Sequence, residues 1–400
     1  MSRSAAEAKA AASPRRRRSL ITDPRFRSVV IQAVLLAAII GIGWLLFDNA
    51  RQNLAAQKIV SGFGFFGETA GFGISQTLIP YTEASTFGRA FFVGLVNTLV
   101  VAALAIVLAT IIGFAVGIAR LSSNELLARL AEAYVEILRN LPLLFQILFW
   151  YLAVLGTLPG PRESSPLLGV IYLTNRGVLF PRIEFQSGSG MVLAALGFGI
   201  LLALILRFIA RNQSLAGSRR RHFRWLPLLL IIGLPALAFV AAGAPASVEW
   251  PELRGFNFVG GARVNPELLA LLFALSTYTA SFIAEIVRAG VLAVPRGQTE
   301  AAFSLGLPRS VTLRRVVAPQ AMRLIVPPLT SQYLNIIKNS SLAAAIGYPD
   351  FFYVFAGTTL NQTGQAIEII AITMAVYLAI SLVTAIFMNW YNRAVALKGA

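Results

Sequence analysis

The chain has 400 residues, of which 57% are hydrophobic and only 13% are charged, whereas about a quarter of the residues in an ordinary soluble domain carry charge. This shortage of charge excludes an ordinary soluble enzyme. The absence of cysteine and the single histidine, His222, argue against disulfide frameworks, zinc clusters and Ser-His-Asp catalysis. The formal net charge is +17, but the arginines cluster between apolar blocks. We therefore attribute the charge to membrane topology and expect no nucleic-acid partner.

A polar segment precedes the first apolar block. Residues 1–28 are basic, with consecutive arginines at 15–18, and are predicted to form a cytoplasmic tail. Eight apolar blocks follow, each near or above the roughly 20 residues that cross a hydrocarbon core. They are Val29–Phe47, Ala90–Ala119, Ile137–Leu155, Met191–Ala210, Trp225–Ala242, Pro266–Ala289, Leu324–Ala345 and Ile367–Tyr391. The sequence therefore predicts an all-α integral membrane protein with about eight transmembrane helices.

The distribution of basic residues predicts how these helices are oriented. With a cytoplasmic N-terminus, most of the 34 Lys and Arg fall on the cytoplasmic side, as the positive-inside rule requires. The reverse orientation would expose Arg219–Arg221 and the basic stretch 288–323 outside. We therefore expect both termini in the cytoplasm and long periplasmic loops at 48–89, 156–190 and 243–265. No loop is long enough to hold a catalytic domain.

One cytoplasmic loop is basic and is punctuated by small and helix-breaking residues. Its distinctive residues are Glu300, Ala301, Ala302, Gly306, Pro308, Val316 and Pro319. Glu300 opens a predicted helical turn, and Gly306 tolerates the positive φ of a following turn. Pro308 suits the first turn of a second helical piece. The two alanines are small enough to let another surface approach closely. The spacing predicts a helix–turn–helix at the cytoplasmic face of the membrane.

This loop resembles the EAA loop of type I ABC importer permeases. The resemblance rests on Glu-Ala-Ala, three residues, glycine, nine residues, an aliphatic residue and then proline. Val316 stands where isoleucine is common, and Ala318 where leucine is common, but the spacing is intact. The resemblance implies that the loop docks in a groove of a separate ATP-hydrolysing subunit and transmits its closure to the membrane helices.

Three further segments resemble polar amino-acid permeases of this family. Ser276–Tyr278 with Ala284–Gly290 is similar to their helix that enters the EAA loop, and Arg139–Gln146 and Lys338–Leu342 are similar to two of their shorter motifs. The resemblance covers about 91–391, and so implies an ABC type I permease domain at 90–391 with its coupling loop at 300–319. The remaining parts are the tail (1–28), the first helix with its loop (29–89) and a second cytoplasmic tail (392–400).

The N-terminal region and the middle of the chain resemble a particular subtype. Asp23–Arg27, the large loop after the first span and two extra mid-chain spans are similar to the Q-type permease of the general L-amino-acid ABC transporter. This implies a type I core with an extra N-terminal helix and two inserted helices. It also implies the partners, which are a cytoplasmic ATP-binding subunit, an M-type permease in a heterodimer, a periplasmic amino-acid-binding protein and the lipid bilayer.

Charged residues within the spans offer further candidates. Glu285 and Arg288, at i and i+3, are predicted to form a local ion pair that supports the helix entering the loop. Glu136 and Arg139 share that spacing and are expected to be structural anchors, although Arg139 could instead contact the coupling region.

Two glycines are predicted to have a structural role. Gly113 and Gly117, at small-xxx-small spacing, are expected to serve helix packing.

Lys338 lies about 14 residues, or roughly 21 Å, into its predicted span. A lysine at such depth usually faces a protein interior or a cavity. The candidate substrate pathway consists of Ser331, Asn335, Lys338, Asn339 and, more weakly, Gln146. Pro327 and Pro328 predict a broken or kinked helix. The alternative is that Lys338 is paired structurally at that kink or near the helix end.

These observations favour a permease that imports L-amino acids by alternating access. The chain has no P-loop motif and no Gly-Lys pair, so ATP and Mg²⁺ are expected on the partner ATPase, with no cofactor bound here and no catalytic residue. The alternative from another class is an ion-gradient secondary transporter of polar solutes. That alternative would need intramembrane acids, in which these spans are poor. A membrane anchor or assembly factor without transport is a third possibility.

Overall fold

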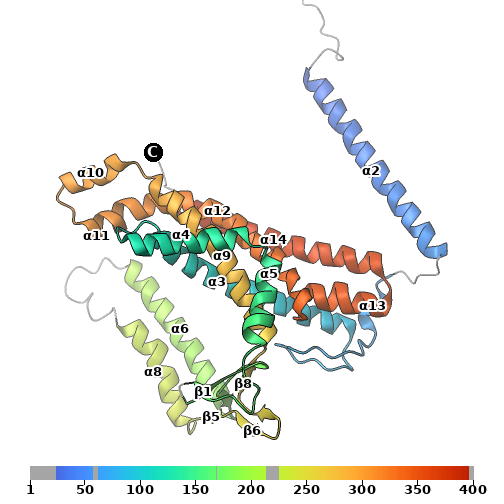
Figure 1. Cartoon of the computed structure of the whole chain (residues 1–400), viewed down its shortest axis with the longest axis horizontal. Helices are drawn as coiled ribbons and strands as arrows, with labels where there is room; N and C mark the ends of the chain where they lie inside the picture. Colours follow the sequence, from blue (N-terminus) through green and yellow to red (C-terminus); the bar gives the residue numbers. More distant parts are fainter. Residues whose placement is uncertain (1–23, 57–61, 168, 213–224, 396–400) are drawn as a thin grey trace, which may run out of the picture. The chain divides into compact units, whose positions relative to one another are not determined.

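The computed structural model describes residues 24–56, 62–167, 169–212 and 225–395 (Figure 1). They form two compact units, each described separately. The first contains helix α2, residues 62–65 and the segment 360–368, and the second contains 66–359 and 369–395. Most of the predicted tails at 1–28 and 392–400 lies outside the described residues.

Helix α2, Pro24–Ala56, is the main element of the first unit. Pro24 occupies the first turn, where its missing N–H would have no helical partner. The apolar window of α2 has no buried residue. A helix with this composition and exposure is suited to a lipid environment rather than to water. The unit also holds α13, Leu360–Thr363, and a hydrogen bond of 2.7 Å from the Gly62 N–H to Oε1 of Glu368.

The second unit is mostly helical, as predicted. Its α-helices are α3 (Phe87–Ala119), α4 (Glu125–Asn140), α5 (Leu143–Leu148), α6 (Ser189–Asn212), α8 (Leu226–Ala241), α9 (Pro266–Leu292), α10 (Arg296–Ser304), α11 (Arg309–Thr312), α12 (Ala318–Asn339) and most of α14 (Ala366–Val395). The 3₁₀ segments are the end of η2 (Gly64–Gly67) and η5 (Ser340–Ile346), and the π-helical segments are η3 (Phe149–Leu155), η4 (Leu313–Val317) and η6 (Phe352–Thr359).

Helix α9 forms the centre of the core of this unit. It packs against α3, α12, α4, α5 and η3, and 61% of its most apolar window is buried. Glycines allow the closest approaches. A Cβ on Gly113 would lie 2.6 Å from Cβ of Ile283, and one on Gly117 would lie 2.8 Å from the carbonyl oxygen of Ala284. The prediction that these glycines serve helix packing is confirmed.

Short antiparallel strands occupy the two long segments that flank α6 and α8. They are β1 (Pro166–Leu167), β2 (Ile171–Thr174), β3 (Gly177–Phe180), β4 (Arg182–Phe185), β5 (Ala246–Glu249), β6 (Glu252–Arg254), β7 (Asn257–Val259) and β8 (Ala262–Val264). Leu179 of β3 pairs with Arg263 of β8, and Ile183 of β4 pairs with Val248 of β5. Segments predicted as separate loops therefore fold back on each other.

The third predicted span, Ile137–Leu155, is wrong as a single helix. The α4 and α5–η3 segments are bent by 107°. Leu141, between them, adopts an extended conformation (φ −91°, ψ 130°), because the ring of Pro142 disfavours helical geometry at the residue before it. The α4 helix instead begins at Glu125, well before the predicted start.

The other spans agree more closely with helices in the structure. Five described helices are long and apolar enough to cross a membrane, and the bent pair would make a sixth. The shorter α8 covers the predicted fifth span, and α12 covers most of the seventh. α12 continues through Pro327 and Pro328, so a break there is wrong, while a kink stays a prediction. The total of eight spans and the orientation stay predictions.

We expect Gly113→Ala to destabilise the protein, because its new methyl group would overlap the side chain of Ile283. Overpacking of this kind typically costs about 1–3 kcal/mol. Thermal unfolding of the purified protein in detergent measures the effect. Gly197→Ala in α6 is the matched control, since no atom lies within 4 Å of its added Cβ. Equal unfolding temperatures for the two variants would contradict the close packing of α3 on α9.

Candidate functional site

The predicted turn at Gly306 is built by a pair of backbone hydrogen bonds that end α10. The Leu307 N–H donates to the carbonyl of Ala302 at 3.1 Å, and the Gly306 N–H donates to the carbonyl of Phe303 at 2.9 Å. This is the Schellman arrangement, which places the residue after the helix in the left-handed region. Gly306 has φ +75°. A residue with a Cβ would be disfavoured here, so the expectation of a glycine turn is confirmed.

A second helical piece follows the turn directly. Pro308 is the N-cap of α11, one residue before the predicted first turn, and its carbonyl accepts hydrogen bonds from the N–H groups of Val311 and Thr312 at 2.9 and 3.0 Å. The chain continues through η4 into α12, where Pro319 lies in the first turn. The Gln320 side chain bonds Gln298 of α10 at 3.3 Å. The loop is therefore an ordered helix–turn–helix.

The helix–turn–helix at 296–319, which contains the predicted coupling loop (300–319), presents apolar side chains to its surroundings. Leu305 at the turn is 80% exposed, and Phe303 and Leu313 are about half exposed. Glu300 and Ala301 are also exposed, whereas Ala302 is buried within the loop. Of the two small residues predicted to admit another surface, only Ala301 faces outward. A soluble surface rarely keeps such a cluster uncovered unless it binds something.

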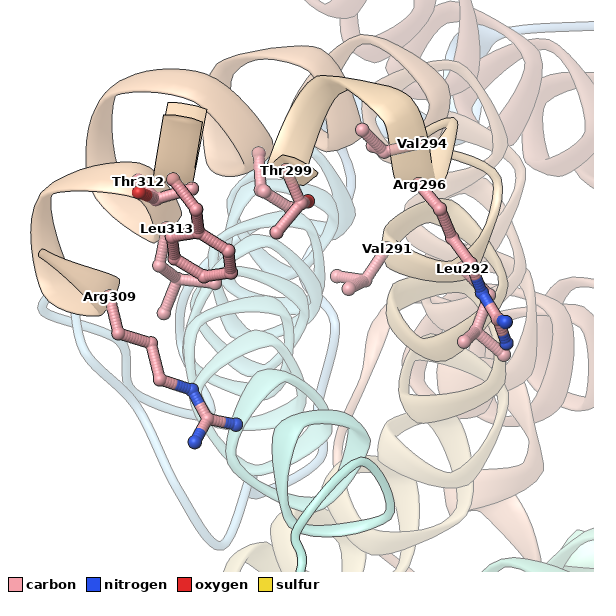
Figure 2. Close-up of a pocket in the computed structure, with 10 residues that line it drawn as sticks. Val291, Leu292, Val294, Arg296, Thr299, Arg309, Thr312 and Leu313 are labelled. Carbon is pink, nitrogen blue, oxygen red and sulfur yellow. The ribbon is translucent and has the colours of Figure 1, made fainter. Parts of the chain in front are cut away.

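A pocket of about 380 Å³ lies between the end of α9, α10 and α11 (Figure 2). Its wall is apolar at Val291, Val294 and Leu313. The Arg296 and Arg309 side chains stand at its rim in the close-up. Because Phe303 and Leu313 line the pocket beside Arg296 and Arg309, it combines apolar area with positive charge, which suits a protein partner.

An ion-pair cluster supports the end of α9 that leads into this loop. The predicted Glu285–Arg288 pair is present at 2.6 Å. Glu285 also bonds Arg120, the residue that caps α3, and Arg120 contacts Glu132 of α4 at 3.7 Å. The Arg120 side chain is 10% exposed. The cluster joins three helices, so the predicted local pair is one part of a larger network.

Sequence reasoning missed Arg120 as a member of this network. Its signal was a single arginine directly after a long apolar run, but spacing along one helix cannot reveal a partner on another. Glu136 and Arg139, predicted as anchors, form no ion pair within 4.0 Å among the described residues. Arg139 instead lies over the ring of Phe282, 5.0 Å from its centre.

Three of the pathway candidates lie on one exposed face of α12. Ser331, Asn335 and Lys338 are exposed and Asn339 is half-buried. Within the described chain Lys338 has no carboxylate within 4.0 Å. Gln146 differs, because it is buried and its amide donates to the carbonyls of Leu138 and Leu141, at the end of α4.

Comparison with known proteins identifies the family. Residues 105–397 match the model of the inner membrane component of binding-protein-dependent transport systems. The chain belongs to this family. It is therefore a multi-pass inner-membrane component, in agreement with its apolar helices.

Close relatives of this permease span nearly its whole length. It is 53% identical over 377 residues to a putative amino-acid ABC transporter permease, YhdX, of Escherichia coli K12, covering 94% of this chain and 95% of the relative. It is 50% identical over 380 residues to the general L-amino acid transport system permease AapQ of Rhizobium johnstonii, covering 95% of each.

More distant matches have related names. A permease of a glutamate/glutamine/aspartate/asparagine transport system, BztB of Rhodobacter capsulatus, is 41% identical over 412 residues, covering 95% of this chain and 96% of the relative. A chain in the crystal structure of an amino acid ABC transporter with histidines has 20% identity and a TM-score of 0.45, covering 77% of this chain and 95% of that one.

We expect Glu285→Gln to destabilise the permease, because it leaves Arg120, mostly buried, and Arg288 without the carboxylate that both bind. Loss of charged hydrogen bonds at such a position costs about 1–3 kcal/mol. Glu125→Gln in α4 is the control, since its pair with Arg129 is about three-quarters exposed on both sides and exposed pairs contribute little. Thermal unfolding should separate the two variants, and similar losses would argue against a structural role for the cluster.

Proposed function

We propose that this chain is the membrane-spanning permease subunit of an ATP-binding-cassette importer that carries L-amino acids from the periplasm to the cytoplasm. The observation that carries this proposal is the ordered loop at 296–319, with its exposed leucines, in a chain of the binding-protein-dependent family. The names of the relatives, which match over almost the whole chain, support amino acids as the cargo and an ATP-driven importer over a secondary transporter.

The proposed partners follow from the surfaces and from the family. A cytoplasmic ATP-binding subunit would cover Leu305, Phe303 and the pocket beside them, and would hold ATP and Mg²⁺ itself. This chain would then hydrolyse nothing. A periplasmic binding protein would deliver the amino acid. A second, M-type permease would complete the pathway as a heterodimer, a proposal supported by the resemblance to the Q-type subunit.

Mechanical coupling is proposed to pass through α9. This helix is continuous from Pro266 to Leu292 and only three residues separate it from α10. A shift of the loop driven by closure of the ATPases therefore reaches a helix that packs against four other helices. Because packed cores switch between discrete arrangements instead of deforming gradually, such a shift can open the pathway on the opposite side of the membrane.

The polar face of α12 is proposed to line this pathway. An ammonium in a membrane helix is costly unless it faces water, protein or a ligand. Lys338 has a polar surrounding in Asn335 and Ser331 on the same exposed face. A substrate carboxylate would supply the negative charge that the described part of this chain does not place beside it.

We expect Gly306→Pro to abolish ATP-driven uptake of L-glutamine in proteoliposomes while leaving membrane insertion intact. Proline cannot donate the hydrogen bond to Phe303, and its ring fixes φ near −65°, so it cannot adopt φ +75°. ATPase activity stimulated by the binding protein should fall with uptake. Gly297→Ala, an exposed glycine of α10 with open space around it, is the control. Normal uptake by Gly306→Pro would refute the role of the loop.

We expect Lys338→Met to raise the KM for uptake by about tenfold, the usual effect of losing one charged hydrogen bond. Lys338→Arg should keep most of the affinity because it retains the positive charge. Uptake is measured over a range of amino-acid concentrations with the binding protein saturating. A KM unchanged in Lys338→Met would remove α12 from the pathway and leave the coupling loop untouched.

A further inference from the structure

A second cavity lies on the permease, away from the coupling pocket and from the α12 face. It has a volume of about 450 Å³ and lies among the end of α3, the last turns of α4 and the last three turns of α9. Glu136, Arg139 and Asn140 of α4 form one wall, and Phe282, Glu285 and Arg288 of α9 form the other. This volume falls within the roughly 300–1,000 Å³ of sites for small molecules.

The charges around this cavity divide into two groups. Arg120, Arg288, Glu285 and Glu132 bond one another in the cluster already described. Glu136 and Arg139 stand outside it, and neither has an ion-pair partner within the described ranges. They are also not paired with each other, although they are one helical turn apart. Along its exposed α4 wall the cavity thus presents one carboxylate and one guanidinium without an ion-pair partner among the described residues.

Arg139, an exposed side chain of α4, has an aromatic contact with Phe282. The guanidinium carbon of Arg139 lies 5.0 Å from the centre of the Phe282 ring, a favourable cation–π distance. A cation–π contact uses no N–H donor of the guanidinium in a hydrogen bond, so these donors can form a fork that matches a carboxylate. Arg139 is therefore positioned as a binding group without being neutralised.

We propose that this cavity binds a free α-amino acid as a zwitterion, on the side of the permease that carries the coupling loop. The α-carboxylate would bind Arg139, the α-ammonium would bind Glu136, and Asn140 could bond either group. A simple anion would satisfy Arg139 but leave Glu136 without a partner, and a simple amine would do the reverse. Only a ligand with both charges close together uses both residues.

The location gives this site a role that rests on the proposed function. Arg288 is one turn before the end of α9 and α10 follows directly, so the cavity is on the cytoplasmic side if the loop is. A ligand there is the product of transport. It stabilises whichever conformation forms the cavity, and accumulated amino acid would therefore slow further uptake.

The test uses the complete transporter in lipid nanodiscs without the binding protein, and measures equilibrium binding of radiolabelled L-glutamine. We expect Arg139→Gln and Glu136→Gln each to weaken binding by about tenfold or more, the effect of losing one charged hydrogen bond. Arg129→Gln, on the same helix but outside the cavity lining and paired with Glu125, should bind like the unmodified protein. Unlabelled L-alanine should compete, and propionate and ethylamine should compete far less.

The outcomes separate this inference from the proposed function. Unchanged L-glutamine binding in both Arg139→Gln and Glu136→Gln overturns the proposed cavity site. An equal loss of binding in Arg129→Gln overturns it too. Loss of binding in Lys338→Met with full binding in Arg139→Gln would place the site on α12 and also overturns it. ATP-driven uptake by the unmodified transporter is measured in parallel. If the unmodified transporter shows no uptake, the proposed function fails. If uptake is normal and the cavity variants bind L-glutamine as the unmodified protein does, only the proposed cavity site is refuted.

Discussion

Close packing around α9 is the constraint on which the rest of the second unit depends. Helices in a membrane have little hydrophobic drive to associate, because lipid is as apolar as the side chains. They associate where small residues allow their backbones to meet. Gly113 and Gly117 of α3 allow that helix to approach α9 closely. Gly290 of α9 allows the same close approach of α12, because a Cβ added to Gly290 would lie 2.4 Å from the side chain of Ile325. A helix held so tightly on several sides moves as a rigid element or not at all.

This packing explains why the two ends of α9 matter. At one end β8 leads into the helix through Asn265, and β8 pairs with β3 in the inserted segments. At the other end the ion-pair cluster and the coupling loop follow within a few residues. A displacement imposed at either end is therefore carried along a single helix of 27 residues, instead of being absorbed in flexible connections.

The sequence predicted those features that depend on neighbours along the chain. The apolar blocks, the glycine turn at Gly306 and the Glu285–Arg288 pair all follow from composition or from spacing of a few residues. The bend at Pro142 had a local signal too, since a residue before proline avoids the helix, but the long apolar stretch outweighed it. The β3–β8 pairing and the Arg120–Glu285 contact join residues far apart along the chain, 165 positions for Arg120 and Glu285. No single-sequence pattern specifies such contacts.

Charge compensation within the chain separates the ion-pair cluster from the residues proposed to bind amino acids. Removing a charge from water is costly unless a partner compensates it, and the cluster of Arg120, Glu285 and Arg288 meets that requirement within the chain. Lys338 and Arg139 do not meet it within the described residues, yet both stand on helices rich in apolar residues. Water, a second permease or a ligand must then supply the compensation. In the proposed pathway and the proposed cavity, the carboxylate of an amino acid supplies this compensation.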